Sequence, residues 1–148
     1  MAVDVETQIV IPRPCAEVAA YAGDPSNATA WYENIEDVEW KTPPPLAVGS
    51  KVAFVARFLG RRLAYTYEIT DYVPGERLVM STANGPFTME TTYTWEDAGN
   101  AATSMTLRNA GEPAGFSRLY APVMAAAIRR ANRKDLRRLR HILESAKR

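Results

Sequence analysis

Three tyrosines are the residues whose chemistry stands out in this 148-residue sequence. Tyr65, Tyr67 and Tyr93 fall on the apolar side of segments that alternate as strands do. A buried phenol needs a hydrogen-bond partner, so several phenols on one dry face favour a cavity where water or a ligand supplies it. For each tyrosine taken singly, a bond to a backbone carbonyl or a place at the sheet edge is the alternative.

Other reactive side chains offer little for catalysis. His141, the single histidine, is predicted near the C-terminal end of a basic helix, where a positive charge interacts favourably with the helix dipole. Cys15 is predicted at a helix start, which lowers a thiol pKa, but burial as a small apolar residue is the favoured interpretation. The sequence has no metal-ligand spacing of His or Cys, phosphate loop or G-x-S-x-G elbow. We therefore predict no metal and no cofactor.

Charged residues near these strands are predicted to face solvent. Arg57 alternates with the apolar face of its strand and should point outward, although a bulge would turn it into the cavity to bind a carboxylate. The acidic group 33–39 has carboxylates that a hard cation prefers but lacks the glycine-punctuated loop of a calcium site. Solvated surface is the favoured interpretation for both.

The elements that must position these residues are seven strands and one long helix. The strand segments alternate around Val5, Val38, Phe54, Tyr67, Met80, Tyr93 and Met105. Pro14 and Asp24-Pro25 mark the starts of two short helices after the first strand. From Phe116 to about Ala146, apolar residues recur every three or four positions, which predicts an amphipathic helix. Pro122 either kinks that helix or separates a short first turn from it.

Composition and charge indicate one globular domain, residues 1–148. The chain is 47% hydrophobic and 24% charged with net charge +1, and no apolar run reaches the roughly 18 residues of a membrane span. We expect a cytoplasmic protein without stable membrane insertion. Residues 129–148 nevertheless hold nine Lys or Arg against two acidic residues. This basic helix face is predicted to be solvated, and nucleic-acid binding is disfavoured because no aromatic side chain is interleaved to stack on bases.

Several short motifs in order resemble one known superfamily. They are Ile11-Pro12-Arg13-Pro14, Asp24-Pro25 with Trp31 beyond it, Gly49-Ser50, the turn from Tyr72 to Leu78, and the end of the helix from Asp135 to Glu144. Together they resemble the helix-grip fold of the START-like (SRPBCC) superfamily, which includes Bet v 1-like proteins. The similarity is greatest to polyketide cyclase/dehydrase-like and lipid-transport-like members.

This resemblance implies an α+β helix-grip fold: a curved antiparallel sheet of about seven strands wrapped around a long C-terminal helix. It also implies a cavity between the concave sheet face and that helix. The side chains expected to line the cavity are Trp31, Phe54, Phe58, Tyr65, Tyr67, Met80, Met89, Tyr93, Tyr120 and Met124. Trp31 is expected at the cavity mouth, with packing of the short helices onto the sheet as an equal alternative.

Three functions follow as hypotheses. The first is binding of a small hydrophobic or amphipathic molecule, lipid or polyketide-like, in the cavity. The second is an aromatase/cyclase-type enzyme that uses cavity tyrosine and arginine side chains. The third is an interaction module that docks through the basic face of the last helix. Fold resemblance alone does not choose among them.

Overall fold

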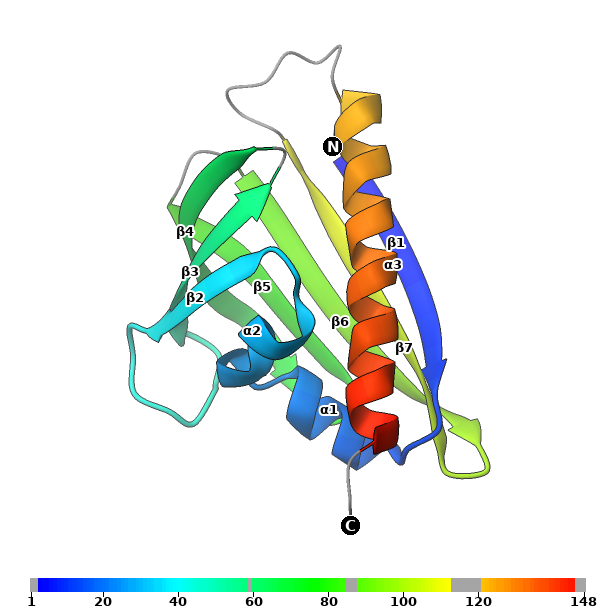
Figure 1. Ribbon diagram of the computed structural model, residues 1–148. Helices are drawn as coiled ribbons and strands as arrows, with labels where there is room; N and C mark the ends of the chain where they lie inside the picture. The colour runs from blue at the N-terminus through cyan, green and yellow to red at the C-terminus, as the bar shows by residue number, and fades with distance from the viewer. Residues whose placement is uncertain (1–2, 59, 85–87, 113–120, 146–148) are drawn as a thin grey trace.

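The computed structural model describes residues 3–58, 60–84, 88–112 and 121–145. They form a curved seven-stranded sheet with a long helix lying across its concave face (Figure 1). The strands are β1 (Val3–Ile11), β2 (Ile35–Trp40), β3 (Lys51–Phe58), β4 (Arg61–Val73), β5 (Arg77–Asn84), β6 (Thr88–Gly99) and β7 (Ala102–Glu112). The helices are α1 (Cys15–Ala22), the short 3-10 turn η1 (Pro25–Asn27), α2 (Ala28–Trp31) and α3 (Ala121–Ser145). The predicted helix-grip fold is confirmed.

Every neighbouring pair of strands is antiparallel, in the order β1-β7-β6-β5-β4-β3-β2. The first strand, β1, therefore forms one edge of the sheet next to the last strand, β7, and β2 forms the other edge. The hairpin predicted between β3 and β4 is present, and Gly60 takes the positive φ of +77° that its turn requires. Pairing this extensive fixes which side chains face the concave side.

Register shifts bend the middle of the sheet. Between β4 and β5 the pairing slips at Thr66/Tyr67 and again at Ile69/Asp71. An extra residue on one strand increases the local twist and bends that strand. The bends turn β2, β3 and β4 toward the helix, so the sheet forms a concave wall instead of a flat one (Figure 1).

The predicted alternation of faces is confirmed in the strands that matter most. In β6, Met89, Thr91, Tyr93 and Trp95 are buried, while Glu96 on the opposite face is exposed. In β3 and β4 the buried side chains likewise stand two residues apart. One dry face opposite one wetter face is the expected pattern for an antiparallel sheet covered on one side.

The short helices occupy the predicted positions. Pro14 precedes the first residue of α1, and Asp24 caps η1 by accepting a hydrogen bond of 2.9 Å from the Ser26 N–H. Arg13, at the end of the same connection, donates to the backbone carbonyls of Leu143 at 2.8 Å and of Glu144 at 3.1 Å. These carbonyls lie in the last described turn of α3, where helix carbonyls commonly need partners from outside the helix, so Arg13 ties the first strand to this part of the helix.

Helix α3 is held to the sheet by leucines on its inner side. Leu136, Leu139 and Leu143 are 0–3% exposed. The described helix begins at Ala121, with Pro122 as its second residue. The residues before it, on which the choice between a kink and a separate first turn depends, lie outside the described residues. Val123 is one of the apolar residues at helical spacing that predict this amphipathic helix, but its side chain is 59% exposed, so its predicted place on the buried side is wrong. The predicted beginning from Phe116, and Ala146 at the other end, lie outside the described residues.

Within the described ranges, no helix is long and apolar enough to cross a membrane.

Candidate functional site

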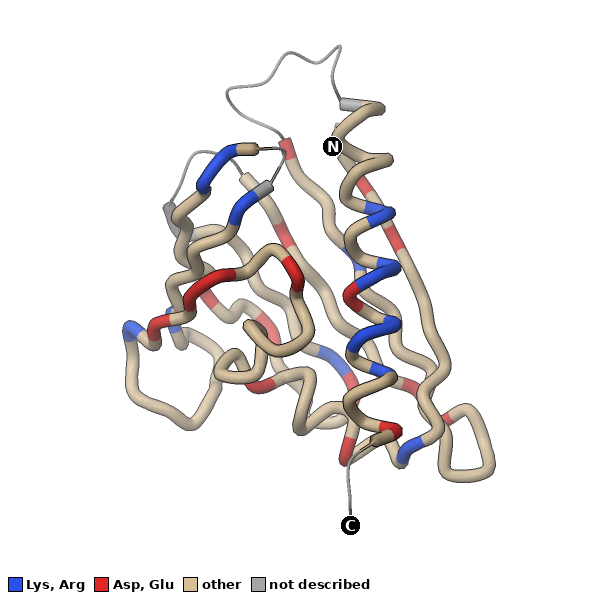
Figure 2. The backbone as a smooth tube through the Cα atoms, in the orientation of Figure 1, with Lys and Arg blue, Asp and Glu red and all other residues tan. Residues whose placement is uncertain are grey.

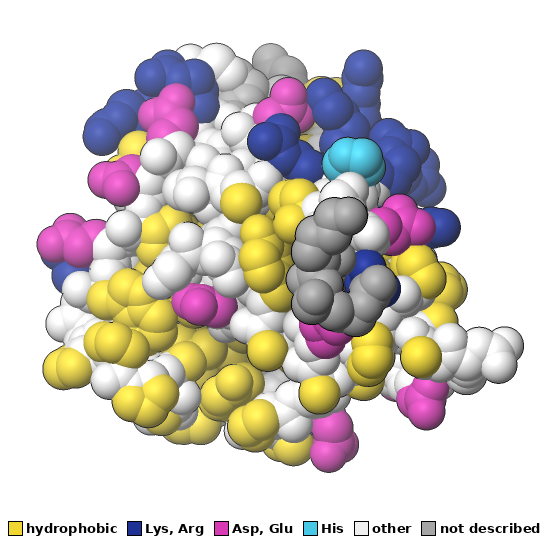
Figure 3. Space-filling view, turned by 60° about the horizontal axis from the view of Figure 1, so that its bottom comes forward, with side chains coloured by type: hydrophobic (Ala, Val, Ile, Leu, Met, Phe, Trp, Pro, Cys, Tyr) yellow, Lys and Arg dark blue, Asp and Glu magenta, His cyan; other side chains and the backbone are white. Residues whose placement is uncertain are grey.

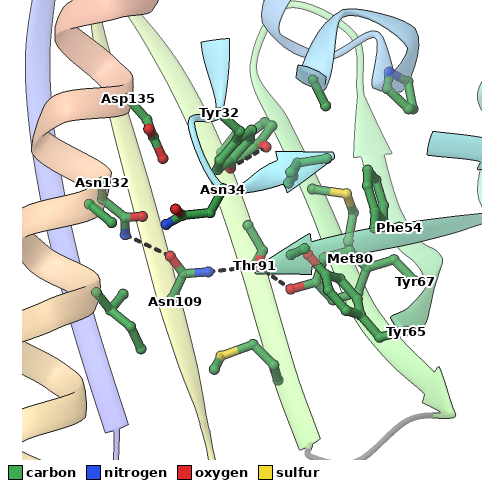
Figure 4. Close-up of a pocket in the computed structure, with 18 of the residues that line it drawn as sticks. Tyr32, Asn34, Phe54, Tyr65, Tyr67, Met80, Thr91, Asn109, Asn132 and Asp135 are labelled. Carbon is green, nitrogen blue, oxygen red and sulfur yellow. Dashed lines mark hydrogen bonds between the residues drawn. The ribbon is translucent and has the colours of Figure 1, made fainter. Parts of the chain in front are cut away.

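A cavity lies between the concave face of the sheet, the inner side of α3 and the segment from α1 to β2 (Figure 4). It measures about 160 Å³ when counted as space open to the centre of a water molecule. Since one water needs roughly 10–15 Å³ by that measure, there is room for about ten waters or a molecule of similar bulk. A space this large in a packed interior is a candidate binding site.

Most of the predicted lining residues border this cavity. Seven of the ten do so: Phe54, Tyr65, Tyr67, Met80, Met89, Tyr93 and Met124. Trp31 is corrected, because it is fully buried and does not line the space. Its ring lies behind Tyr32, with centroids 4.1 Å apart, and packs α2 onto the sheet. The side chains of Phe58 and Tyr120 lie outside the described residues.

One end of the cavity is aromatic. Phe54 and Tyr65 face each other across β3 and β4 and stack with centroids 5.7 Å apart, while Tyr67 meets Tyr65 edge-on at 5.2 Å. Pairs of this geometry are favourable beyond the area they bury. Met80 contributes a flexible, polarizable side chain to the same end (Figure 4). This wall suits an apolar or aromatic body.

A chain of hydrogen bonds crosses the cavity wall from the sheet to the helix. The Tyr67 and Thr91 hydroxyls lie 2.6 Å apart, and Asn109 Nδ2 donates to Thr91 Oγ1 at 2.8 Å. Asn132 Nδ2 then donates to Asn109 Oδ1 at 2.7 Å. Four elements, β4, β6, β7 and α3, are thereby linked through polar groups in an otherwise apolar interior. A buried network satisfied in this way specifies one arrangement of helix and sheet.

A second pair of phenols stands nearby. The hydroxyls of Tyr32 and Tyr93 are 2.6 Å apart. Burial raises the pKa of Tyr93 and of Tyr32 well above their usual range, and it raises the pKa of Tyr67 to about 12. These phenols are therefore neutral hydrogen-bonding groups near neutral pH. When one hydroxyl of the Tyr32/Tyr93 pair donates to the other, the acceptor keeps a proton to offer elsewhere.

Asp135 is the ionisable group that sequence reasoning missed. Its side chain reaches the polar end of the cavity beside Asn34 and Tyr32, although the residue belongs to the basic helix (Figure 4). It is 2% exposed, and one carboxylate oxygen accepts a hydrogen bond of 3.0 Å from the Glu33 N–H. Burial raises the pKa of Asp135 to about 6, against the lowering effect of that hydrogen bond. The carboxyl therefore changes charge close to physiological pH.

Position on the helix explains this placement. Asn132 and Asp135 are one turn apart and share the inner side of α3 with Leu136 and Leu139. The available signal was a polar residue at a position where the apolar stripe called for a hydrophobic one. Asn109 gives the same signal in β7, where it follows Met105 and Leu107 on the inward face.

The remaining candidates from the sequence lie elsewhere. Arg57 points outward, as predicted, and its Nε lies 3.0 Å from Glu36 Oε2. His141 is exposed on α3. Cys15 is half-buried with its thiol 3.4 Å from the Gly75 carbonyl oxygen, and burial raises its pKa instead of lowering it. None of these three side chains lines the cavity.

Comparison with known proteins places the chain in a family. Residues 2–144 match the family model described as polyketide cyclase/dehydrase and lipid transport. The chain belongs to this family. No curated protein matches the sequence significantly.

Solved structures share the fold of this chain at low sequence identity. The Zhui aromatase/cyclase of a Streptomyces species aligns with a TM-score of 0.79 at 16% identity, over 95% of this chain and 93% of that one. A START superfamily protein from Mycobacterium smegmatis aligns with a TM-score of 0.80 at 11% identity, over 95% and 97% of the two chains. A protein from Thermus thermophilus aligns with a TM-score of 0.83 at 18% identity, over 97% and 99%. Similarity at this level shows the fold and leaves the ligand open.

The outward side of α3 carries the basic stretch (Figure 2). Several of its side chains serve the fold: Lys134 Nζ lies 2.9 Å from Glu33 Oε2, and Arg138 Nε donates to the Ala30 carbonyl at 2.7 Å. Arg133 and Arg137 are exposed. In the face seen in Figure 3, basic side chains gather on one part and hydrophobic ones on the other. The basic face thus holds α3 against α2 and leaves an additional charged surface.

Proposed function

We propose that this protein binds a small amphipathic molecule, with an apolar or aromatic body, in the cavity between the sheet and α3. The carrying observation is the division of that cavity into an aromatic end at Phe54, Tyr65 and Met80 and a polar end at Tyr32, Asn34 and Asp135. An apolar pocket with a few convergent polar groups is the usual form of a small-molecule site. The family, whose description includes lipid transport, supports the same proposal.

The cavity corresponds to about the bulk of ten waters. A fused aromatic ring system or a short acyl chain fits a space of this size. Lipid-like and polyketide-like bodies therefore both remain within the proposal, and the aromatic wall favours the second.

Native mass spectrometry of the protein purified without organic solvent, together with thermal shift, tests the proposal. The compounds are fatty acids, fatty alcohols and aromatic polyketide mimics. We expect either a molecule carried from the host or stabilisation by at least one compound, because a ligand that binds only the folded state raises the melting temperature. Absence of both would overturn the proposal.

A second candidate function, a cyclase acting on a polyketide-like substrate, is favoured by Asp135. Such cyclisation needs a base to take a proton from a carbon between two carbonyls, and an acid to protonate the carbonyl oxygen that the new carbon–carbon bond leaves charged. A carboxyl whose pKa is about 6 suits the first task, and neutral phenols such as Tyr93 suit the second. The alternative in which a bulge turns Arg57 into the cavity is not supported, since that side chain points outward as predicted.

The cyclase candidate is tested with a soluble poly-β-ketone mimic. We expect ring closure to be faster with the protein than in buffer and to slow on Asp135→Asn. Equal rates for the wild-type protein and buffer would rule out this activity while leaving ligand binding intact.

The basic face of α3 supports the third hypothesis less well. Lys134 and Arg138 are engaged within the chain, and the lining of the cavity includes no basic side chain among the described residues. We therefore propose the cavity, and not the basic face of α3, as the functional site.

A further inference from the structure

The ionisable side chains that line the cavity include carboxyl groups and no basic group among the described residues. Among the lining residues that the structure describes there is no lysine, arginine or histidine, but there are two carboxyl groups, Asp24 and Asp135. Asp24 is exposed, and its carboxylate caps η1. The interior of the cavity therefore has Asp135 as its one carboxyl among these residues and no counter-charge for an anionic ligand.

The nearest basic groups on α3 do not neutralise Asp135 from inside the cavity. Lys134 and Arg138 flank it in sequence, but Lys134 pairs with Glu33 and Arg138 with the Ala30 carbonyl, both on the outer side. Within the described part of the chain, the Glu33 N–H is the one hydrogen-bond donor to the carboxylate. A buried carboxylate with a single neutral donor is costly, and an added cation would compensate that cost.

Aromatic rings stand next to this carboxyl. Tyr32 lies beside Asp135 at the polar end, and its hydroxyl bonds to that of Tyr93 (Figure 4). The faces of tyrosine rings carry partial negative charge and attract cations. A carboxylate near tyrosine rings is a chemistry that can recognise an ammonium group.

We propose that the ligand of this cavity is an amphipathic amine, whose protonated nitrogen pairs with Asp135 and whose apolar body lies against Phe54, Tyr65 and Met80. This inference rests on the proposed function and adds the charge of the ligand to it. A carboxylate of the same shape is rejected, because the cavity would bring two negative charges together without a compensating cation.

The pairing depends on the charge of Asp135. The groups that bear on it are Glu33 and Tyr32 from the segment after α2, Tyr93 from β6, and Lys134 and Arg138 from its own helix. The phenols stay neutral, so below a pH of about 6 the carboxyl is protonated and the attraction for an ammonium is lost. Amine binding therefore weakens as the pH falls through this range, whereas binding of a neutral analogue does not.

Three probes with one body test the inference: naphthylethylamine, naphthylethanol and naphthylacetic acid, titrated by calorimetry near pH 7.5 and near pH 5. At the higher pH we expect the amine to bind at least about tenfold more tightly than the alcohol, and the acid to bind least, since hydrogen bonds between charged partners are the stronger kind. The preference for the amine should shrink at the lower pH.

Two variants test whether the preference for the amine comes from Asp135. Asp135→Asn keeps the size of the side chain and an acceptor for the Glu33 N–H, and it should abolish the preference for the amine while the alcohol still binds. Glu144→Gln removes a charge from the exposed side of the same helix and should leave the preference unchanged. Alcohol binding by Asp135→Asn also verifies that its cavity is formed; if that variant does not fold, the pH dependence of the wild-type protein decides.

The outcomes separate the two proposals. Binding of the alcohol with equal or weaker binding of the amine would overturn the charge inference and leave the proposed function standing. An amine preference that survives Asp135→Asn would also overturn the inference. Binding of none of the probes, with none of the broader panel stabilising the protein, would overturn both.

Discussion

Asn132 on α3 donates a hydrogen bond of 2.7 Å to Asn109 on β7, and this contact joins the helix to the sheet inside the cavity wall. Asn109 passes the connection on to Thr91, which meets Tyr67. The leucines of α3 pack against the sheet, and these hydrogen bonds fix the position of the helix along its own axis. The cavity keeps its shape because both kinds of contact act on one helix.

Removing either asparagine should destabilise the protein. Asn132→Ala leaves the Asn109 oxygen without its donor, and Asn109→Ala also removes the donor to Thr91, so the second change should cost more. Each is expected to cost about 1–3 kcal/mol of unfolding free energy, measured by urea denaturation. The double variant should cost less than the sum, because the two side chains contact each other. Strict additivity would contradict the account.

The order of two changes at the other end of the chain of hydrogen bonds is also predicted. Tyr67→Phe removes one hydroxyl and leaves Thr91 with the Asn109 donor, at an expected cost of about 1 kcal/mol. Thr91→Val removes the partner of both Tyr67 and Asn109 and should cost more. Urea denaturation of the two variants checks the order, and the reverse order would show that the network is not shared as described.

Stability should fall with rising pH because of Asp135. Its pKa is about 6 in the folded protein against an ordinary value of 3.8, so the folded state binds this proton more tightly than the unfolded chain does. The contribution of this proton to the free energy of unfolding is fully present below a pH of about 4 and is lost as the pH rises through about 6. The free energy of unfolding should fall by about 3 kcal/mol over this range, at roughly 1.4 kcal/mol per pKa unit.

Asp135→Asn isolates that contribution from those of other carboxyl groups. The difference in unfolding free energy between this variant and the wild-type protein should shift in favour of the variant from pH 4 to pH 7.5. A difference that stays constant across this range would mean that the carboxyl is not desolvated as the structure indicates.

The grip of α3 on the sheet is tested by two residues of the same helix. Leu139 is fully buried, and Leu139→Ala should cost about 2–5 kcal/mol through the lost contacts and the remaining cavity. Val123 is 59% exposed, and Val123→Ala should change stability by no more than about 0.5 kcal/mol. Thermal and urea denaturation measure the loss of stability in the two variants. Similar losses would contradict the orientation of α3, in which Leu139 faces the sheet and Val123 faces solvent.

The fold was open to prediction because its signals are local and repeated. Alternation in β6, the cap at Asp24 and the apolar spacing around Leu139 each constrain one element, and the ordered motifs join them into a known architecture. Val123 shows the limit of this reasoning. An apolar residue at stripe spacing is buried only if the sheet extends beneath it, and spacing carries no information about that extent.

The apolar part of the cavity lining was open to prediction from the sequence, whereas Tyr32, Asn34 and Asp135 were missed. Phe54, Tyr65 and Met80 follow from inward alternation alone. Asp135 sits among basic residues in the sequence, so its local charge pattern indicated a solvated face; only the rotation of α3 about its axis turns it inward. The pairing of Tyr32 with Tyr93 depends on a contact across 61 positions, which no local pattern encodes.

Filling the cavity tests the central claim most directly. Ala56 lines the cavity from β3 and is 7% exposed, and Ala56→Phe would place a ring in the space assigned to the ligand. Calorimetric titration with the tightest-binding naphthyl probe, on the wild-type protein and on this variant, is the measurement. We predict that the wild-type protein binds and that the variant, with an unchanged circular dichroism spectrum and cooperative unfolding, does not. Equal binding by the two folded proteins would contradict a ligand site inside this cavity.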